Sequence, residues 1–245
     1  MMATFVLVHG GGHGGWCYQP LARLLQTRGH IAYTPTLTGL GERSHLLNEA
    51  IDLNLHIRDV VQLLHYEDLR DAILVGHSYG GMVITGAADR AHDRVSHRVY
   101  LDAAYPKNGE SLAEHATSLI QARQQSRVVH GMELFLFPDS DHGFYGVADA
   151  EIRAWMKPRL TPHPWVCFEQ PLVLHNEAAM RAIPESHIIC TATIPGRDMP
   201  LLRERSEGRI WDIDTGHDLM LTEPEWVADR LCEVVAVKQG KECAA

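Results

Sequence analysis

Short apolar segments alternate with amphipathic helical segments along the chain, and this alternation constrains the fold more than any other feature. The predicted strands are Thr4–Val8, Ile31–Thr34, Ala72–Val75, Arg98–Leu101, His187–Thr191 and Ile210–Ile213. The predicted helices are Trp16–Arg28, Leu55–Tyr66, Gly81–Ala91, Leu201–Ser206 and Pro224–Lys238. Strands separated by helices pair in parallel, because a parallel pair needs a crossover connection. The order therefore predicts an α/β fold with a doubly wound, mostly parallel sheet of about six strands.

The regular pattern loosens between residues 107 and 184. Helical pieces around Ser111–Gln124 and Asp149–Lys157 are separated by stretches rich in proline and aromatic residues. We expect one domain, residues 1–245, with residues 107–184 inserted as a helical cap. Its aromatic residues are candidates for either an apolar pocket or the core: Phe135, Phe137, Phe144, Tyr145, Trp155 and Trp165.

Composition limits the partners and the compartment. The net charge is -9, with acidic and basic residues interspersed, which argues against nucleic acid or an anionic membrane as partner. Because no apolar run has membrane-spanning length and no secretory signal is recognisable, we expect a cytoplasmic protein. The five cysteines lack the spacing of a disulfide framework or a zinc site: Cys17, Cys167, Cys190, Cys232 and Cys243. The oligomeric state stays open, with a homodimer as one option.

A serine motif lies between a predicted strand and a predicted helix. Gly76-His77-Ser78-Tyr79-Gly80 matches G-x-S-x-G, the sharp turn that exposes a nucleophilic serine. The flanking glycines let the strand and the helix approach each other, and the helix N-terminus favours developing negative charge. Ser78 is therefore the candidate nucleophile, and an incidental Gly/Ser turn is the less favoured alternative.

A glycine cluster follows the first strand. Gly10, Gly12 and Gly15 also satisfy the dinucleotide-binding pattern G-x-G-x-x-G, but the acidic residue needed about 20 positions later is absent from the end of the second strand. The alternative is an oxyanion loop, in which bare backbone lies close to a substrate carbonyl. The amides of Gly11 and Tyr79 would then be the two donors.

A histidine follows the last predicted strand, where a general base can reach the serine. His217 lies in Asp214-Thr215-Gly216-His217-Asp218, and the order serine, acid, histidine is typical of this kind of triad. The acid is expected after strand His187–Thr191, and Asp198 is the first carboxylate found there. We select Asp198, with Asp102 at the end of the preceding strand as the alternative; a strand-end Asp bonded to nearby amides is an equally good explanation of Asp102.

The chain resembles the small α/β-hydrolases that include bacterial carboxylesterases, pyrethroid hydrolases, plant methylesterases and hydroxynitrile lyases. The matching stretches are VLVHGGGHGGWCYQPLARLL, TLTGLGERSHLL, LVGHSYGGMV, YLDAAYP and TGHDLMLTEPEWVADRL. The resemblance implies a helical cap, no cofactor, and Ser78, His217, Gly11 and Tyr79 in the roles above.

Two departures from that family matter. The family's acid usually stands at the position of Thr193 or Ile194, so Asp198 serves only if its loop folds back. The lyases carry a threonine and a lysine where this chain has Gly10 and Asp218, which disfavours cyanohydrin cleavage.

Together these features predict a serine esterase that acts on small apolar aryl or alkyl esters or lactones through an acyl-enzyme. Two alternatives remain. One is cofactor-free lyase or decarboxylase chemistry on a carbonyl compound, and the other is a ligand-binding protein on a degenerate hydrolase scaffold.

Overall fold

A computed structural model describes residues 2–137 and 145–238, and its centre is a six-stranded parallel sheet. The strand order is β2-β1-β3-β4-β8-β9, and every neighbouring pair is parallel. The strands are β1 Thr4–Val8, β2 Ile31–Tyr33, β3 Ala72–His77, β4 Val95–Leu101, β8 Glu185–Cys190 and β9 Ile210–Ile213. The structure confirms the predicted sheet, because all six predicted apolar segments form strands in it.

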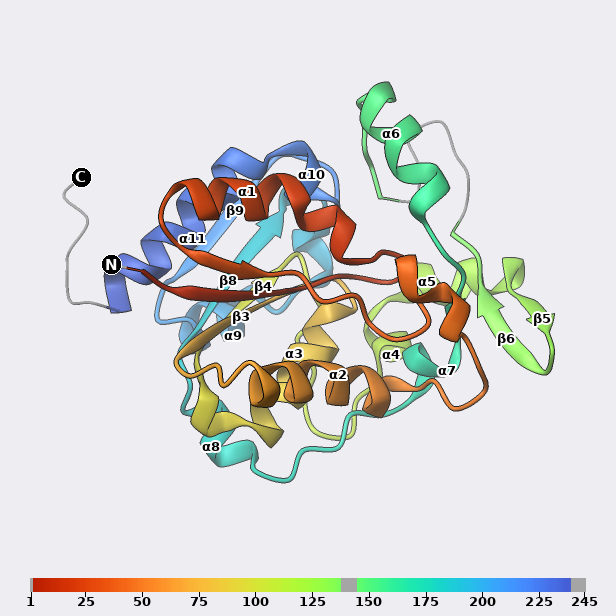
Figure 1. Cartoon of the computed structure of the whole chain (residues 1–245), viewed down its shortest axis with the longest axis horizontal. Coiled ribbons are helices and arrows are strands. Elements are labelled where there is room, and N and C mark those ends of the chain that lie inside the picture. The colour runs from red at the N-terminus through yellow and green to blue at the C-terminus, as the bar shows by residue number, and fades with distance from the viewer. Residues whose placement is uncertain (1, 138–144, 239–245) are drawn as a thin grey trace.

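Helices cover both faces of this sheet (Figure 1). On one face lie α1 (Gln19–Thr27), α10 (Leu219–Thr222) and α11 (Pro224–Lys238), and on the other α2 (Leu53–Tyr66), α3 (Gly80–Arg90) and α8 (Glu177–Arg181). The sheet separates two apolar cores because successive strand residues point to opposite faces. Along β1, Phe5 and Leu7 enter one core, while Val6 and Val8 enter the other.

The helix boundaries follow local capping chemistry. Helix α2 begins two residues before the predicted Leu55, because Asp52 caps it by accepting a hydrogen bond from the Leu55 amide at 2.7 Å. The predicted helix Trp16–Arg28 divides into a 3-10 turn, Gly15–Tyr18, and α1, which carries Pro20 in its first turn. Helix α9, Met199–Arg205, connects β8 to β9. No helix within the described ranges is long and apolar enough to cross a membrane.

The region 107–184, which the sequence predicts to be an inserted helical cap, is not purely helical. It contains the short helices α4 (Leu112–His115), α5 (Thr117–Ala122), α6 (Ala150–Met156) and α7 (Val166–Glu169). It also contains an antiparallel sheet of β5 (Arg127–Val129), β6 (Met132–Phe135) and β7 (His163–Pro164), which the sequence analysis did not predict. The cause is the two-residue turn His130-Gly131, where φ is 50° and 81°. Two positive φ values match the twist of a tight hairpin.

Apart from α8, which packs beside α3, this region, the proposed cap, lies at the carboxyl end of β1 (Figure 1). A Cβ built on Gly11 would lie 3.1 Å from the Phe137 ring and 3.2 Å from the Phe168 ring. The Thr161 amide donates to the carbonyl of Gly12 at 2.9 Å. The cap therefore contacts the glycine loop directly.

We expect Gly76→Ala to lower the free energy of unfolding by about 1–3 kcal/mol, the usual range for overpacking. A Cβ at this position would lie 2.5 Å from the backbone oxygen of Gly80, so strand and helix would have to separate. Urea denaturation measures the change. The control is Gly196→Ala, where a Cβ meets no described atom within 4 Å; equal effects of the two substitutions would contradict the steric explanation.

Candidate active site

Ser78 occupies a strained turn between β3 and α3. Its φ is 53°, a left-handed conformation that is uncommon outside glycine. A Cβ at Gly80 would lie 2.4 Å from the carbonyl oxygen of Val8, and a Cβ at Gly76 would lie 2.5 Å from the backbone oxygen of Gly80. The motif therefore needs a glycine on each side of the serine. The structure thus confirms the sharp turn that the motif predicts.

The glycine loop after β1 packs against this turn. A Cβ on Gly10 would lie 2.9 Å from the Ser78 Cβ, so the loop runs beside the serine. Within residues 2–137 and 145–238, neither the Gly11 amide nor the Tyr79 amide donates to a protein acceptor. The Tyr79 amide also lies at the N-terminus of α3, where the helix dipole favours an anion.

His217 follows β9 and is attached to the serine turn through its backbone. His77 Nε2 donates to the His217 carbonyl oxygen at 2.9 Å, and the two rings lie 4.6 Å apart. The Nδ1 atom of His217 lies 2.5 Å from Asp102 Oδ2 and donates to it. This tautomer leaves Nε2 of His217 as the atom that can accept a proton from Ser78.

Asp102, at the end of β4, is a fully buried carboxylate. Its Oδ2 binds His217, and its second oxygen, Oδ1, accepts three further hydrogen bonds. Oδ1 accepts from the Thr193 hydroxyl at 2.6 Å, from Arg197 Nη2 at 2.7 Å and from the Cys190 amide at 3.2 Å. Burial acts to raise the pKa of Asp102, but the hydrogen bond and charge of His217 and the charge of Arg197 hold it well below its usual range. Asp102 therefore stays ionised.

The strand end that carries Asp102 is also joined to the serine turn. The Ser78 amide donates to the Leu101 carbonyl at 3.4 Å, and the Ala104 amide donates to the Ser78 carbonyl at 3.0 Å. Backbone bonds thus hold the serine and the carboxylate in one frame, although they belong to different strands.

Asp198 does not take the position that the sequence analysis assigned to it. It is exposed, and its side chain accepts a hydrogen bond from the Leu201 amide at 3.1 Å as the N-cap of α9. The reason is that Thr191–Gly196 forms a 3-10 helix after β8 rather than a loop that folds back to His217. Asp102, the alternative, holds the imidazole instead.

Thr193 and Arg197 were missed by the sequence analysis. Arg197 binds Asp102 and donates through Nη1 to the Ala103 carbonyl at 2.9 Å. The sequence carries no signal for this pairing, because 95 residues separate Arg197 from Asp102. Arg197 directly precedes Asp198 in the sequence, so only the fold shows that its guanidinium binds Asp102 instead.

The ionisation of His217 reflects its partner. Burial lowers the pKa of His217, but the hydrogen bond and negative charge of Asp102 outweigh burial, so the pKa lies above the ordinary value. Burial lowers the pKa of both His9 and His77 to about 3. These two neighbouring rings therefore stay neutral while His217 titrates.

Three buried side chains beside Tyr79 have the composition of a metal site. The candidate ligand atoms of His56, His163 and Cys167 lie within 4.8 Å of one another. However, His163 Nδ1 accepts from the Gly12 amide at 3.2 Å, so its Nε2 carries the proton. His56 donates to the Thr38 carbonyl and accepts from the Tyr79 hydroxyl. Both imidazole lone pairs are occupied, and we assign the cluster no metal.

The cap aromatics divide between core and site. Phe135, Trp165 and Tyr145 are buried, and Trp155 packs edge-on against Trp16. Phe137 is half-buried and contacts Gly11 and Gly12. Phe144 lies outside the described residues.

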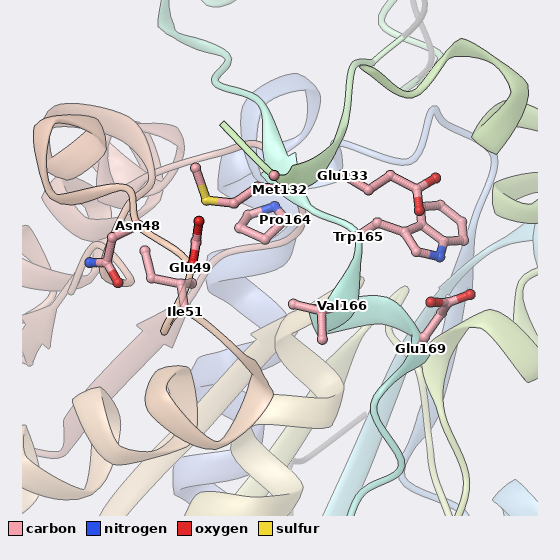
Figure 2. A pocket seen from close by; sticks show the side chains of 10 residues that line it. Asn48, Glu49, Ile51, Met132, Glu133, Pro164, Trp165, Val166 and Glu169 are labelled. Atoms are coloured by element: carbon pink, nitrogen blue, oxygen red, sulfur yellow. The ribbon is translucent and has the colours of Figure 1, made fainter. Parts of the chain in front are cut away.

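A separate pocket of about 300 Å³ lies between residues 48–51 and the cap (Figure 2). Figure 2 shows the side chains of Glu49, Glu133 and Glu169 around an apolar surface that includes Trp165. Glu133 and Glu169 both pair with Arg123, whose single positive charge offsets part of their negative charge. Ser78, His217 and Asp102 do not line this pocket, so it is distinct from the candidate catalytic site.

The sequence profile of the family described as "Alpha/beta hydrolase family" matches residues 5–230. A carbendazim hydrolyzing esterase from Nocardioides sp. (strain SG-4G) is 37% identical over 241 residues, which cover 94% of this chain and 98% of the esterase.

Solved structures show the same fold. An extracellular alpha/beta-hydrolase from a Paenibacillus species, described as sharing structural and functional homology with tobacco salicylic acid binding protein 2, is 25% identical with a TM-score of 0.77. The match covers 94% of this chain and 98% of that one. The methylesterase MES16 from Arabidopsis is 22% identical with a TM-score of 0.77, and the match covers 96% of this chain and 99% of that one.

We expect Asp102→Asn to lower kcat by about 10³- to 10⁴-fold, because an amide neither stabilises the imidazolium nor fixes its tautomer. Asp198→Asn, the matched control, should leave kcat unchanged and alter stability by less than about 1 kcal/mol, since Asn also caps helices. Steady-state ester hydrolysis by both variants measures this. Loss of activity in the Asp198 variant alone would refute the assignment of Asp102.

We expect Arg197→Met to move the acidic limb of the pH profile of kcat/KM to higher pH. The positive charge of Arg197 lowers the pKa of His217, so its removal raises that pKa and the neutral base is lost at a higher pH. The profile between pH 5 and 9 tests the direction, with Arg203→Met on the surface of α9 as control. A limb that moves to lower pH would contradict the proposed electrostatics.

Proposed function

Because the chain belongs to the alpha/beta hydrolase family, we propose that it is a carboxylic ester hydrolase that forms an acyl-enzyme on Ser78. The observation that carries this proposal is the 2.5 Å hydrogen bond between His217 and buried Asp102, on a loop joined to the serine turn. The esterase relative that matches nearly the whole chain supports the same reaction.

In the acylation step, His217 Nε2 takes the Ser78 proton as Ser78 Oγ attacks the ester carbonyl. The imidazolium that forms is stabilised by the carboxylate of Asp102. His217 then gives the proton to the leaving alcohol, and the acyl group stays on Ser78. Water, deprotonated by the same histidine, releases the acid and restores the serine.

The oxyanion of each tetrahedral intermediate is placed between the Gly11 and Tyr79 amides. Both amides lack a described protein acceptor, so they can donate to a ligand without breaking an existing bond. A donor of this kind stabilises the transition state by about 3 kcal/mol. These are the roles that the sequence predicts for Gly11 and Tyr79.

The substrate class proposed here is small, apolar aryl or alkyl esters or lactones. The rings of Phe137 and Phe168 lie beside Gly11, where the acyl or alcohol group of a bound ester would sit. Arg197, the cation nearest to Asp102, is committed to Asp102 and Ala103. Apolar contact rather than charge pairing therefore suits this site.

The alternative of a degenerate binding protein depended on the missing acid. Because Asp102 supplies a buried carboxylate to His217, nothing in the site favours that alternative. No contact described in the site favours non-hydrolytic carbonyl chemistry over ester hydrolysis. Both alternatives are tested by whether an acyl-Ser78 adduct forms.

We propose the cytoplasm as the compartment, which fits the four described cysteines, all of them free: Cys17, Cys167, Cys190 and Cys232. A small-molecule ester is the proposed partner. A homodimer is an option that size-exclusion chromatography with light scattering would test.

We expect a fluorophosphonate to label Ser78 and Ser78→Ala to lose both labelling and hydrolysis of a short-chain aryl ester, by at least about 10⁴-fold in kcat. Mass spectrometry of the labelled peptide identifies the residue. The control is Ser96→Ala, whose hydroxyl donates to the Asp71 carbonyl near the start of β3. Turnover that survives in the Ser78 variant would instead support the non-hydrolytic alternative.

A further inference from the structure

The peptide group between Gly11 and Gly12 is held at both ends by buried side chains. The Gly11 carbonyl accepts from His13 Nδ1 at 2.9 Å and from the Tyr145 hydroxyl at 2.8 Å. The Gly12 amide donates to His163 Nδ1 at 3.2 Å. A peptide group is planar, so bonds at its two ends fix its orientation. Because glycines have no side chains to pack, these contacts determine where the loop lies.

His13 connects this peptide to a second buried group. Its Nε2 lies 2.9 Å from Asp218 Oδ2, and both side chains have no exposed surface. Burial acts to raise the pKa of Asp218, but the charge and hydrogen bond of His13 outweigh burial and lower it. The Gly11 carbonyl can only accept, so His13 Nδ1 carries a proton, and a second proton lies between His13 and Asp218.

Asp218 directly follows His217, so the pair joins the loop after β1 to the loop after β9. Tyr145 makes a second connection between the same loops, since its hydroxyl donates to Gly11 and its carbonyl accepts from the Asp218 amide at 3.4 Å. Asp218 Oδ1 also lies 3.7 Å from Nε2 of His77, the neighbour of Ser78. Loops from three strands thus meet at one buried carboxylate.

We propose that His13 and Asp218 are positioning residues that hold the Gly11 carbonyl, and through the Gly11 Cα the Gly11 amide, at a fixed separation from His217. This inference rests on the proposed function, in which Gly11 binds the oxyanion and His217 is the base. The pair touches neither substrate nor the reacting atoms. It acts through the Gly11 carbonyl on one side and the His217 backbone on the other, and the negative charge of Asp218 also raises the pKa of His217.

A purely structural role does not require an ion pair here. Well-packed apolar residues of similar volume often stabilise a protein as well as a buried ion pair does. What apolar residues lack is a directed bond to the Gly11 carbonyl. The pair supplies that bond and fixes its direction through Asp218.

The test is Asp218→Asn, which keeps the size of the side chain and removes its charge. We expect kcat for the aryl ester to fall about 10- to 100-fold, because a small misplacement of an oxyanion donor costs rate rather than ground-state binding. KM should stay within about 2-fold of the wild type. The affinity for an arylboronic acid, which forms a tetrahedral adduct with the serine, should fall by the same factor as kcat/KM.

Two further variants keep the proposal falsifiable if Asp218→Asn folds poorly. Tyr145→Phe removes one donor to Gly11 and should lower kcat and boronate affinity together, by a smaller factor. Glu185→Gln is the stability control, because it breaks the buried Arg98–Glu185 pair, 2.6 Å long, away from the loop. It should lower Tm and leave kcat unchanged.

The proposal is overturned if Asp218→Asn and Tyr145→Phe keep wild-type kcat. It is also overturned if Glu185→Gln loses as much kcat as Asp218→Asn at an equal fall in Tm, or if boronate affinity does not change with kcat/KM. Failure of the proposed function looks different, since the wild type itself would then neither turn over the ester nor label at Ser78.

Discussion

The buried carboxylate of Asp102 imposes the constraint on which the arrangement of the site depends. An unpaired buried charge costs several kcal/mol, so its oxygens must be surrounded by donors. Those donors are His217 after β9, and Cys190, Thr193 and Arg197 at and after the end of β8. The one charge at the end of β4 is therefore satisfied by residues at the ends of β8 and β9, the next two strands in the sheet. This convergence also places the imidazole beside the serine turn.

The site also requires segments of backbone to approach each other closely around the serine. Glycine is needed where β3 meets α3 and where the loop after β1 passes the serine, because Cβ atoms at Gly76, Gly80 or Gly10 would overlap other atoms. The loop that results has little means of holding its own shape. Buried histidines hold that shape through hydrogen bonds to its peptide groups: His9 contacts the Gly10 carbonyl, His13 the Gly11 carbonyl and His163 the Gly12 amide. Burial lowers the pKa of His9 to about 3 and that of His163 well below its ordinary value, so these two rings stay neutral.

Much of the fold was predictable from local patterns, and the exceptions have identifiable causes. The apolar strands and amphipathic helices gave the parallel sheet, because their periodicity reflects which faces are buried. The β5–β6 hairpin was missed because its turn, His130-Gly131, has a non-glycine residue at positive φ. The sequence carries no recognisable signal for that conformation at a histidine. Asp198 was preferred to Asp102 because chain order favours a carboxylate after β8. The chain after β8 instead forms the 3-10 helix Thr191–Gly196 and does not fold back to His217. Asp198 therefore caps α9.

By itself, the sequence determined the sheet, the turn that carries Ser78, the glycine loop and the nomination of His217, since each depends on residues close together in the chain. Only the tertiary structure decided which carboxylate faces His217, that Arg197 shares it, and that His13 reaches Asp218 across 205 positions. Such pairings depend on the register of neighbouring strands and on the direction in which each loop leaves its strand. Those are properties of the assembled sheet, and no local pattern of residue types encodes them.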